Sequence, residues 1–328
     1  MRLLNVHTRQ LSEFFGLQIP PYAILSHTWG AEEVSFQELS SSLSLGSSST
    51  PTCIRKLGYL KINYACLQSI EHGLEWVWVD TCCIDKTSSA ELSEAINSMY
   101  AWYQGSVVCY AYLEDMENLK PNHVRWHDSP ESTRTEGRWF TRGWTLQELI
   151  APAKVFFFGK EWDYLGDKIA CSEHLSLMTG IPEDVVRSPN ALRFASVASR
   201  MSWAARRETT RFEDIAYSLL GIFGVNMPLL YGEGKKSFIR LQEEILKDSD
   251  DQTIFVWDYQ TGDMPERFQF RGVLADSPAR FLNSARVVPK SSTSPGERPS
   301  PYSMTNKGLR IELPHGYDKG LKHLIRRS

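Results

Sequence analysis

The first half of the chain alternates short apolar runs with helix-periodic segments, and this order constrains the fold more than any other feature. The apolar runs are residues 22–25, 76–79, 107–113 and 155–159. Apolar side chains recur at helical spacing over residues 54–70 and 92–103. Residues 88–91, from Ser88 to Glu91, form a capping-box start to the second segment. Strands that alternate with helices of this length predict βαβ units, and so an α/β fold with a mainly parallel sheet flanked by helices.

The second half of the chain has a different pattern. Residues 167–247 read as mostly helical, with helices expected at 212–223 and 236–247, and β-like runs follow at 253–257, 272–274, 285–288 and 309–313. We therefore expect an α/β domain at 1–165, a helical extension at 166–250 and a small β-rich region at 251–328, whose abrupt end suggests truncation. Loops are expected in the Ser- or Pro-containing stretches 40–52, 118–137 and 289–301.

Composition narrows the class of protein. The 328 residues are 42% hydrophobic and 23% charged, which predicts a packed core, and the net charge of −3 lacks the basic footprint that DNA binding usually leaves. The N-terminus turns polar within a few residues, and no run approaches the roughly 20 apolar residues of a membrane span. We expect a soluble, cytoplasmic protein without a membrane segment.

The six cysteines indicate neither a metal site nor a disulfide framework. They contain no C-x-x-C pair, and the neighbours Cys82 and Cys83 are poorly placed to bridge each other. Reduced, buried thiols are the expected state, and no metal or cofactor is predicted.

Polar clusters follow the predicted strands, and they locate a candidate site. His27 follows the first strand, and Asp80 and Asp85 follow the second. Ligands of an open parallel sheet bind at the carboxyl ends of its strands. Glu148 stands roughly 9 Å into the next helix at 1.5 Å per residue, so it is expected to reach the same edge.

Each of these residues also has a structural interpretation. Glu148 fits a solvated carboxylate near a favourable helix dipole, and His27 fits a hydrogen-bonded structural histidine. Asp80 fits a turn cap, and Asp85 with Lys86 fits a local ion pair. The residues alone leave these alternatives open.

Four further patterns have weak functional interpretations. Residues 231–237 lack the P-loop spacing, which would need Gly at Leu229 and Ser or Thr at Lys236. The pair His123 and His127 lacks an obvious third metal ligand, which favours a surface loop. Cys82 or Cys83 could form a thiol nucleophile with His27, but buried, unreactive thiols are the favoured interpretation. A basic stretch is interpreted as a solvated helix face or as an anion or partner contact; it comprises Arg193, Arg200, Arg206, Arg207 and Arg211.

Three of these segments together resemble the fungal heterokaryon incompatibility (HET) domain. They are YAILSHTWG at 22–30, WVDTCCIDK at 78–86 and RGWTLQELIAP at 142–152. The resemblance implies fungal non-self recognition (allorecognition, a form of innate immunity) that ends in programmed cell death, through self-association or protein partners. It also implies a fold similar to that of TIR domains, which is a flavodoxin-like, mainly parallel sheet flanked by helices.

The segment that contains Trp144 and Glu148 is similar to the TIR motif of Trp, a short spacer and Glu-Leu. In enzymatic TIR domains that Glu acts on NAD, so the resemblance implies that Glu148 is catalytic and that NAD or a related nucleotide is the substrate. A non-enzymatic signalling module that acts by self-assembly is the alternative, and a Cys-dependent hydrolase is a third. The predicted ligand-binding residues are Ser26, His27, Trp29, Asp80, Asp85, Arg142 and Trp144.

Overall fold

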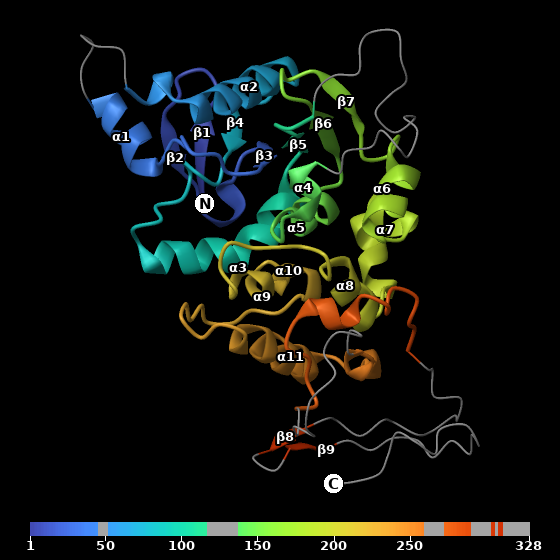
Figure 1. Ribbon diagram of the computed structural model, residues 1–328. Coiled ribbons are helices and arrows are strands. Elements are labelled where there is room, and N and C mark those ends of the chain that lie inside the picture. Colours follow the sequence, from blue (N-terminus) through green and yellow to red (C-terminus); the bar gives the residue numbers. More distant parts are fainter. Residues whose placement is uncertain (45–51, 117–136, 259–271, 290–302, 306–307, 311–328) are drawn as a thin grey trace.

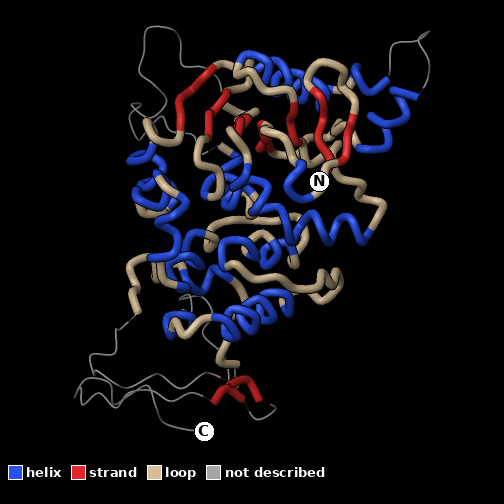
Figure 2. The backbone as a smooth tube through the Cα atoms, turned by 180° about the vertical axis from the view of Figure 1, so that it is seen from behind, coloured by secondary structure: helices blue, strands red, loops and turns tan. Residues whose placement is uncertain are grey.

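A seven-stranded sheet forms the centre of the first half of the chain (Figures 1 and 2). The computed structural model describes residues 1–44, 52–116, 137–258, 272–289, 303–305 and 308–310. The strands lie in the order β2-β1-β4-β3-β5-β6-β7. They are β1 (Arg2–Asn5), β2 (Leu11–Glu13), β3 (Ala23–His27), β4 (Trp76–Trp78), β5 (Val108–Tyr112), β6 (Val155–Phe158) and β7 (Tyr164–Asp167).

The four predicted strands form the parallel centre of this sheet. β3 pairs in parallel with β4 on one side and with β5 on the other, and β5 pairs in parallel with β6. In chain order these four strands lie 2-1-3-4, which is the beginning of the flavodoxin-like order. The predicted α/β, flavodoxin-like class is confirmed. The antiparallel edge strands β1, β2 and β7 were not predicted.

Helices cover both faces of the sheet. α2 (Leu57–Glu71) packs on β3 and β4 from one face, and α3 (Ser89–Gly105) and α5 (Thr145–Ile150) lie together on the other (Figure 1). Placing successive connections on opposite faces is what right-handed crossovers require when the strand order reverses. The predicted cap of α3 is present, because Ser88 Oγ accepts the Glu91 N–H at 3.3 Å. α1 (Phe36–Ser44) occupies the start of the stretch expected to be a loop, and α4 (Arg138–Thr141) precedes α5.

The second half of the chain adds helices below α3 and beside α5 (Figure 1). Its helices are α6 (Ser172–Thr179), α7 (Glu183–Arg187), α8 (Val197–Trp203), α9 (Asp214–Tyr217), α10 (Leu220–Phe223) and α11 (Lys236–Asp248). The single helix predicted at 212–223 is therefore two short helices. α10 lies so close to α3 that a Cβ on Gly221 would come within 2.0 Å of Tyr100 Cβ.

The strands predicted after residue 250 are largely wrong. Gln252–Phe255 is a 3-10 helix, and residues 272–274 and 285–288 form no strand. Thr253 Oγ1 accepts the N–H of Ala198 at the start of α8, so packing against α8 decides this conformation over β propensity. The described strands here are β8 (Ser303–Thr305) and β9 (Gly308–Arg310). Most of the loops expected at 118–137 and 289–301 lie outside the described residues.

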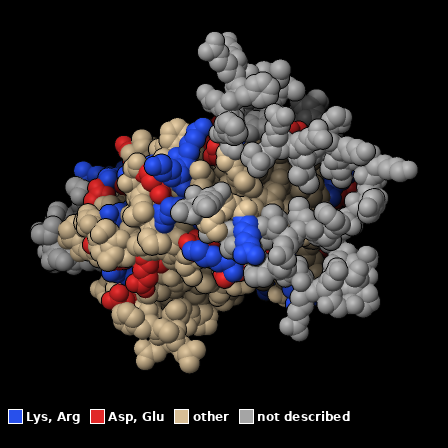
Figure 3. Space-filling model, turned by 90° about the horizontal axis from the view of Figure 1, so that it is seen from below, with Lys and Arg blue, Asp and Glu red and all other residues tan. Residues whose placement is uncertain are grey.

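The described surface mixes both signs of charge. On the face seen from below, Lys and Arg side chains alternate with Asp and Glu side chains (Figure 3). Within the described residues, no helix combines the length and the apolar character needed to cross a membrane.

Candidate functional site

Glu148 lies inside the protein, at the carboxyl end of the parallel strands. All six residues of α5 are buried: Leu146 and Leu149 are fully inaccessible, and Glu148 is 7% exposed. Its carboxylate accepts a hydrogen bond from Ser26 Oγ on β3. Ser26 pairs with Ala111 of β5, so this contact lies where the strand order reverses, the usual ligand position in such sheets. The prediction that Glu148 reaches this edge is confirmed, and the interpretation as a solvated carboxylate is wrong.

Buried donors surround the Glu148 carboxyl. Trp139 of α4 donates its indole N–H to Ser26 Oγ at 2.7 Å, and the Ser26 hydroxyl donates its own hydrogen bond to Glu148. The Tyr103 hydroxyl hydrogen-bonds to the carboxyl and lies 3.2 Å from Leu25 O. These side chains come from β3, α3 and α4, so the site is assembled only when α3 and α4 have packed against the sheet.

Burial dominates the ionisation of Glu148. Loss of hydration raises its pKa to about 8, and the negative charge of Asp80 acts in the same direction. Hydrogen bonds from Ser26 and Tyr103 and the positive charge of Arg207 oppose this rise without cancelling it. Glu148 is therefore mostly protonated at neutral pH, as perturbed acids in functional sites often are.

His27 and Asp80 form a second pair beside this acid. His27 Nε2 lies 2.9 Å from Asp80 Oδ1, and Trp29 donates its indole N–H to Asp80 Oδ2 at 2.7 Å. Lys86 Nζ stands 3.6 Å from the centre of the Trp29 ring, in a cation–π contact. Burial alone would raise the pKa of Asp80, but the hydrogen bond from His27 and the charge of Lys86 hold it well below its usual value. The aspartate is thus a fixed negative charge.

The two pairs come from adjacent strand residues. Side chains alternate across a strand, so Ser26 and His27 are directed to opposite faces of the sheet. The sequence placed His27, Asp80 and Glu148 in one cluster. The structure divides them into a Ser26–Glu148 contact and a His27–Asp80 contact, which communicate through the charge of Asp80.

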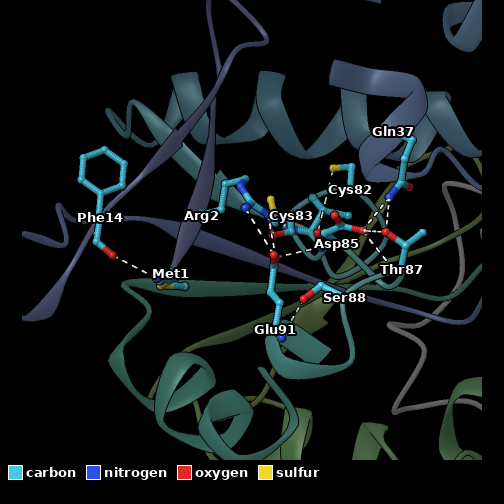
Figure 4. Close-up of polar contacts among 11 residues, drawn as sticks. Met1, Arg2, Phe14, Gln37, Cys82, Cys83, Asp85, Thr87, Ser88 and Glu91 are labelled. Atoms are coloured by element: carbon cyan, nitrogen blue, oxygen red, sulfur yellow. Dashed lines mark hydrogen bonds and ion pairs between the residues drawn. The ribbon is translucent and has the colours of Figure 1, made fainter. Parts of the chain in front are cut away.

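Asp85 lies in a different set of contacts (Figure 4). Its carboxylate accepts hydrogen bonds from Gln37 at 2.6 Å and from Thr87 at 2.6 Å. Its backbone N–H donates to Glu91, which also binds Arg2 at 2.6 Å. These contacts connect the turn after β4 to the start of α3, so the geometry indicates a structural role for Asp85.

Arg142 and Trp144 flank the turn into α5. Arg142 Nη2 donates to Thr210 Oγ1 at 3.1 Å, and Trp144 hydrogen-bonds to Asp214. Arg142 therefore contacts the segment between α8 and α9, Trp144 contacts the start of α9, and neither is joined to Glu148 by these bonds.

Sequence reasoning missed Arg207 as part of this site. It is 8% exposed, and its Nη1 donates to Arg142 O at 2.8 Å and to Thr145 Oγ1 at 2.9 Å. Its position 59 residues after Glu148, within a basic stretch, carried no signal that distinguishes it from its neighbours. The interpretation of that stretch as a solvated face is wrong at Arg207.

The weaker motifs have structural explanations. The N–H groups of Gly232 and Gly234 both donate to the Glu213 carboxylate, at 2.8 and 2.9 Å, so the glycine-rich turn binds an internal anion. All six cysteines are buried and free, as expected. Hydrogen bonding with Cys83 and burial raise the pKa of the Cys82 thiol, which disfavours a thiolate nucleophile. His123 and His127 lie outside the described residues.

Comparison with known proteins identifies the family. Residues 22–136 match the family model of the heterokaryon incompatibility protein (HET). The chain carries a HET domain. The matched residues include His27, Asp80 and Asp85, whereas Glu148 and Arg207 follow them in the sequence.

A curated relative extends the similarity. The vegetative incompatibility protein HET-E-1 of Podospora anserina is 48% identical over 237 residues, which is 70% of this chain. The similar region spans 16% of that protein, so this HET-domain chain corresponds to a small part of its relative. No solved structure matches the chain. Among the residues that the structure describes, no group of three or more His, Cys, Asp or Glu side chains could hold a metal ion.

Proposed function

We propose that this protein acts in heterokaryon incompatibility, as an effector of fungal non-self recognition that triggers programmed cell death. The HET family match and the similarity to a vegetative incompatibility protein support this role. We propose further that it acts in the cytoplasm by cleaving NAD or a related nucleotide, with Glu148 as the catalytic carboxylate.

The observation that carries the enzymatic part is the buried Glu148, held by Ser26 at the switch point of the parallel sheet. Cleavage of NAD breaks the bond between ribose C1′ and the nicotinamide nitrogen. The bonding electrons leave with nicotinamide, water adds to C1′, and one proton is released. An ionised carboxyl group beside the ribose stabilises the positive charge that develops on the sugar, and it does so most strongly where water is excluded.

The neighbouring residues are suited to binding such a substrate. Trp29 is half exposed and donates a hydrogen bond to the negative Asp80, and we expect the part of its ring that Lys86 leaves uncovered to stack on a substrate ring. The carboxyl must ionise to stabilise a cationic sugar, and its pKa is about 8. Cleavage is therefore expected to accelerate as the pH rises toward 8 and to level off above it.

The experiment that tests this function follows nicotinamide release from NAD by the full chain, at high protein concentration and between pH 6 and 9. The wild type should release nicotinamide, and Glu148→Gln should lose at least about 100-fold in rate. The matched control is Glu71→Gln, which removes an exposed carboxylate at the end of α2. Equal rates in the wild type and Glu148→Gln would refute the assignment of Glu148.

A second candidate is a non-catalytic module that acts by self-assembly. It is favoured by exposed apolar side chains along α2, namely Leu57, Leu60, Leu67 and Ile70. In this case toxicity on expression would survive Glu148→Gln and would be lost in Leu60→Glu/Leu67→Glu. Toxicity that follows nucleotide depletion across all variants would exclude the assembly-only function.

A further inference from the structure

Arg207 is a buried cation whose hydrogen bonds all end on neutral oxygen atoms. Its Nη1 donates to Arg142 O and Thr145 Oγ1, and its Nε donates to Trp203 O at 3.3 Å. Among the described residues it forms no ion pair with a carboxylate. A buried guanidinium without an ion-pair partner is costly, which indicates that its charge has another use.

Two sets of hydrogen bonds, joined through the backbone and side chain of Trp139, lead from Arg207 to the acid. Thr145 Oγ1, which accepts from Arg207, itself donates to the Trp139 carbonyl oxygen. Trp139 in turn donates its indole N–H to Ser26, and Ser26 donates to Glu148. Arg207 therefore holds the turn between α4 and α5, the same turn that orients both the donor of Ser26 and the helix that carries Glu148.

The backbone next to Arg207 reinforces this attachment. Glu208 N–H donates to Thr141 O at 2.7 Å, and Gly143 N–H donates to Glu208 O at 2.9 Å, so the two segments pair as a short parallel bridge. Gly143 is required for this approach, because a Cβ there would lie 2.5 Å from Thr209 Cγ2. The turn into α5 is thus fixed by the segment after α8.

Charges reach Glu148 from several packed elements. Asp80 after β4 is negative, whereas Tyr103 of α3 and Cys109 of β5 remain neutral because burial raises the pKa of each. Arg207 is the positive charge that acts on Glu148, and Glu148 is the charge that acts on Arg207 in return. Arg207 and Asp80 therefore act in opposite directions on the ionisation of Glu148.

We propose that Arg207 is the positioning residue of this site: it fixes the turn that carries Glu148 and supplies the positive charge that favours the ionised carboxyl. This inference deepens the proposed function and rests on Glu148 being its working acid. It places an essential part of the site outside the segment that matches the HET family model.

The test measures the ionisation of Glu148 directly by infrared difference spectroscopy of the full chain across pH 5 to 10. The band to follow is the carboxylic-acid carbonyl signal that disappears in Glu148→Gln. In Arg207→Gln the midpoint should rise by about one pH unit or more, which is a tenfold loss of the ionised form at a given pH. In Arg207→Lys, where the charge remains, the midpoint should rise less than in Arg207→Gln.

The matched control is Arg200→Gln. Arg200 is also a partly buried arginine that donates to backbone carbonyls, at Ala195 O and Ile222 O, but the acid whose charge acts on it is Asp251. Its loss should lower stability without moving the Glu148 midpoint. A midpoint in folded Arg207→Gln that equals the wild-type value, or that moves equally in Arg200→Gln, would overturn the proposal.

A double variant keeps the test valid if Arg207→Gln fails to fold. Above pH 9, where the carboxyl of Glu148 ionises, Arg207→Gln leaves a buried negative charge without its cation, so replacing that carboxyl in Arg207→Gln/Glu148→Gln should restore folding at that pH. A double variant that is as unfolded as the single variant would show that Arg207 supports the fold independently of Glu148, and would overturn the proposal. These measurements do not depend on catalysis. If the protein does not cleave NAD but the ionisation midpoint of Glu148 still rises in Arg207→Gln, the enzymatic function is disproved and the role of Arg207 stands.

Discussion

At the scale of single residues, the site is a balance of opposing effects on one carboxyl group. Burial and Asp80 favour the neutral form of Glu148, whereas Ser26, Tyr103 and Arg207 favour the ionised form. The position of Glu148 at the strand edge could be predicted from the sequence, because strand ends and helix length determine it. Its burial and its cation could not, because both depend on helices that follow it by tens of residues.

The first prediction is that Glu148→Gln stabilises the protein at alkaline pH. The pKa of Glu148 rises from 4.5 to about 8 on folding, so there is no destabilisation below pH 4.5, a growing one between pH 4.5 and 8, and a constant one above pH 8. At roughly 1.4 kcal/mol per pKa unit, the gain from removing the carboxyl is on the order of 5 kcal/mol at most. Urea unfolding at pH 4.5 and pH 8 measures it. Asp85→Asn, which removes a carboxylate that lies outside the Glu148 site, should show no such gain, and a gain for Glu148→Gln that is the same at both pH values would contradict the prediction.

The second prediction concerns Asp80. Its negative charge raises the pKa of Glu148, so Asp80→Asn should lower the ionisation midpoint of Glu148 below that of the wild type. This shift is opposite in sign to the one expected for Arg207→Gln. The infrared titration of the carboxyl group measures it, with Asp85→Asn as the control that should leave the midpoint in place. A midpoint that rises in Asp80→Asn would show that the His27–Asp80 pair and Glu148 are linked by packing instead of charge.

At the scale of elements, α5 is short but held at both ends by buried basic side chains. Arg207 binds the turn before it, and Lys168, which is 1% exposed, donates to Ile150 O at 3.1 Å and to Pro152 O at 2.8 Å. A helix of six residues has little stability of its own, so these bonds replace the missing length.

The sequence predicted α5 and the parallel strands because apolar runs and periodicity are local. It predicted a strand at 253–257 wrongly because contact with α8 determines that segment.

The third prediction tests the contact between α10 and α3. Gly221→Ala would place a Cβ within 2.0 Å of Tyr100 Cβ and should force the two helices apart, at a cost of about 3 kcal/mol in the free energy of unfolding. Thermal and urea unfolding measure the loss. Gly105→Ala in α3 is the control, since its Cβ would meet only the Tyr22 hydroxyl, at 3.4 Å. Equal stability of the two variants would contradict the close contact.

At the scale of the whole molecule, the sheet and the helical extension share one site. The sequence divided the chain at residue 165, where the pattern changes from strands to helices. That change of pattern is real, but the bonds of Arg207 and Glu208 to residues 141–145 cross it. Because of these bonds, we expect residues 1–165 and the residues after them to fold as one cooperative unit.

The fourth prediction follows from these bonds. A fragment of residues 1–165 should fail to unfold cooperatively, because it lacks Arg207 and exposes the surfaces of α3 and α5 that α10 and α7 cover. A fragment of residues 1–258 should unfold in a single transition. Circular dichroism and calorimetry of the two fragments check this, and a cooperative transition in the shorter one would show that the α/β region is autonomous.

The distance along the chain between Glu148 and Arg207 has a consequence for protein synthesis. A ribosome that adds about 5–20 residues per second needs several seconds to pass from one residue to the other. During that time the nascent chain holds the acid without the cation, and the turn into α5 lacks its attachment. Under this proposal the site is complete only once Arg207 has been translated, so the order of translation keeps unfinished chains without a complete site.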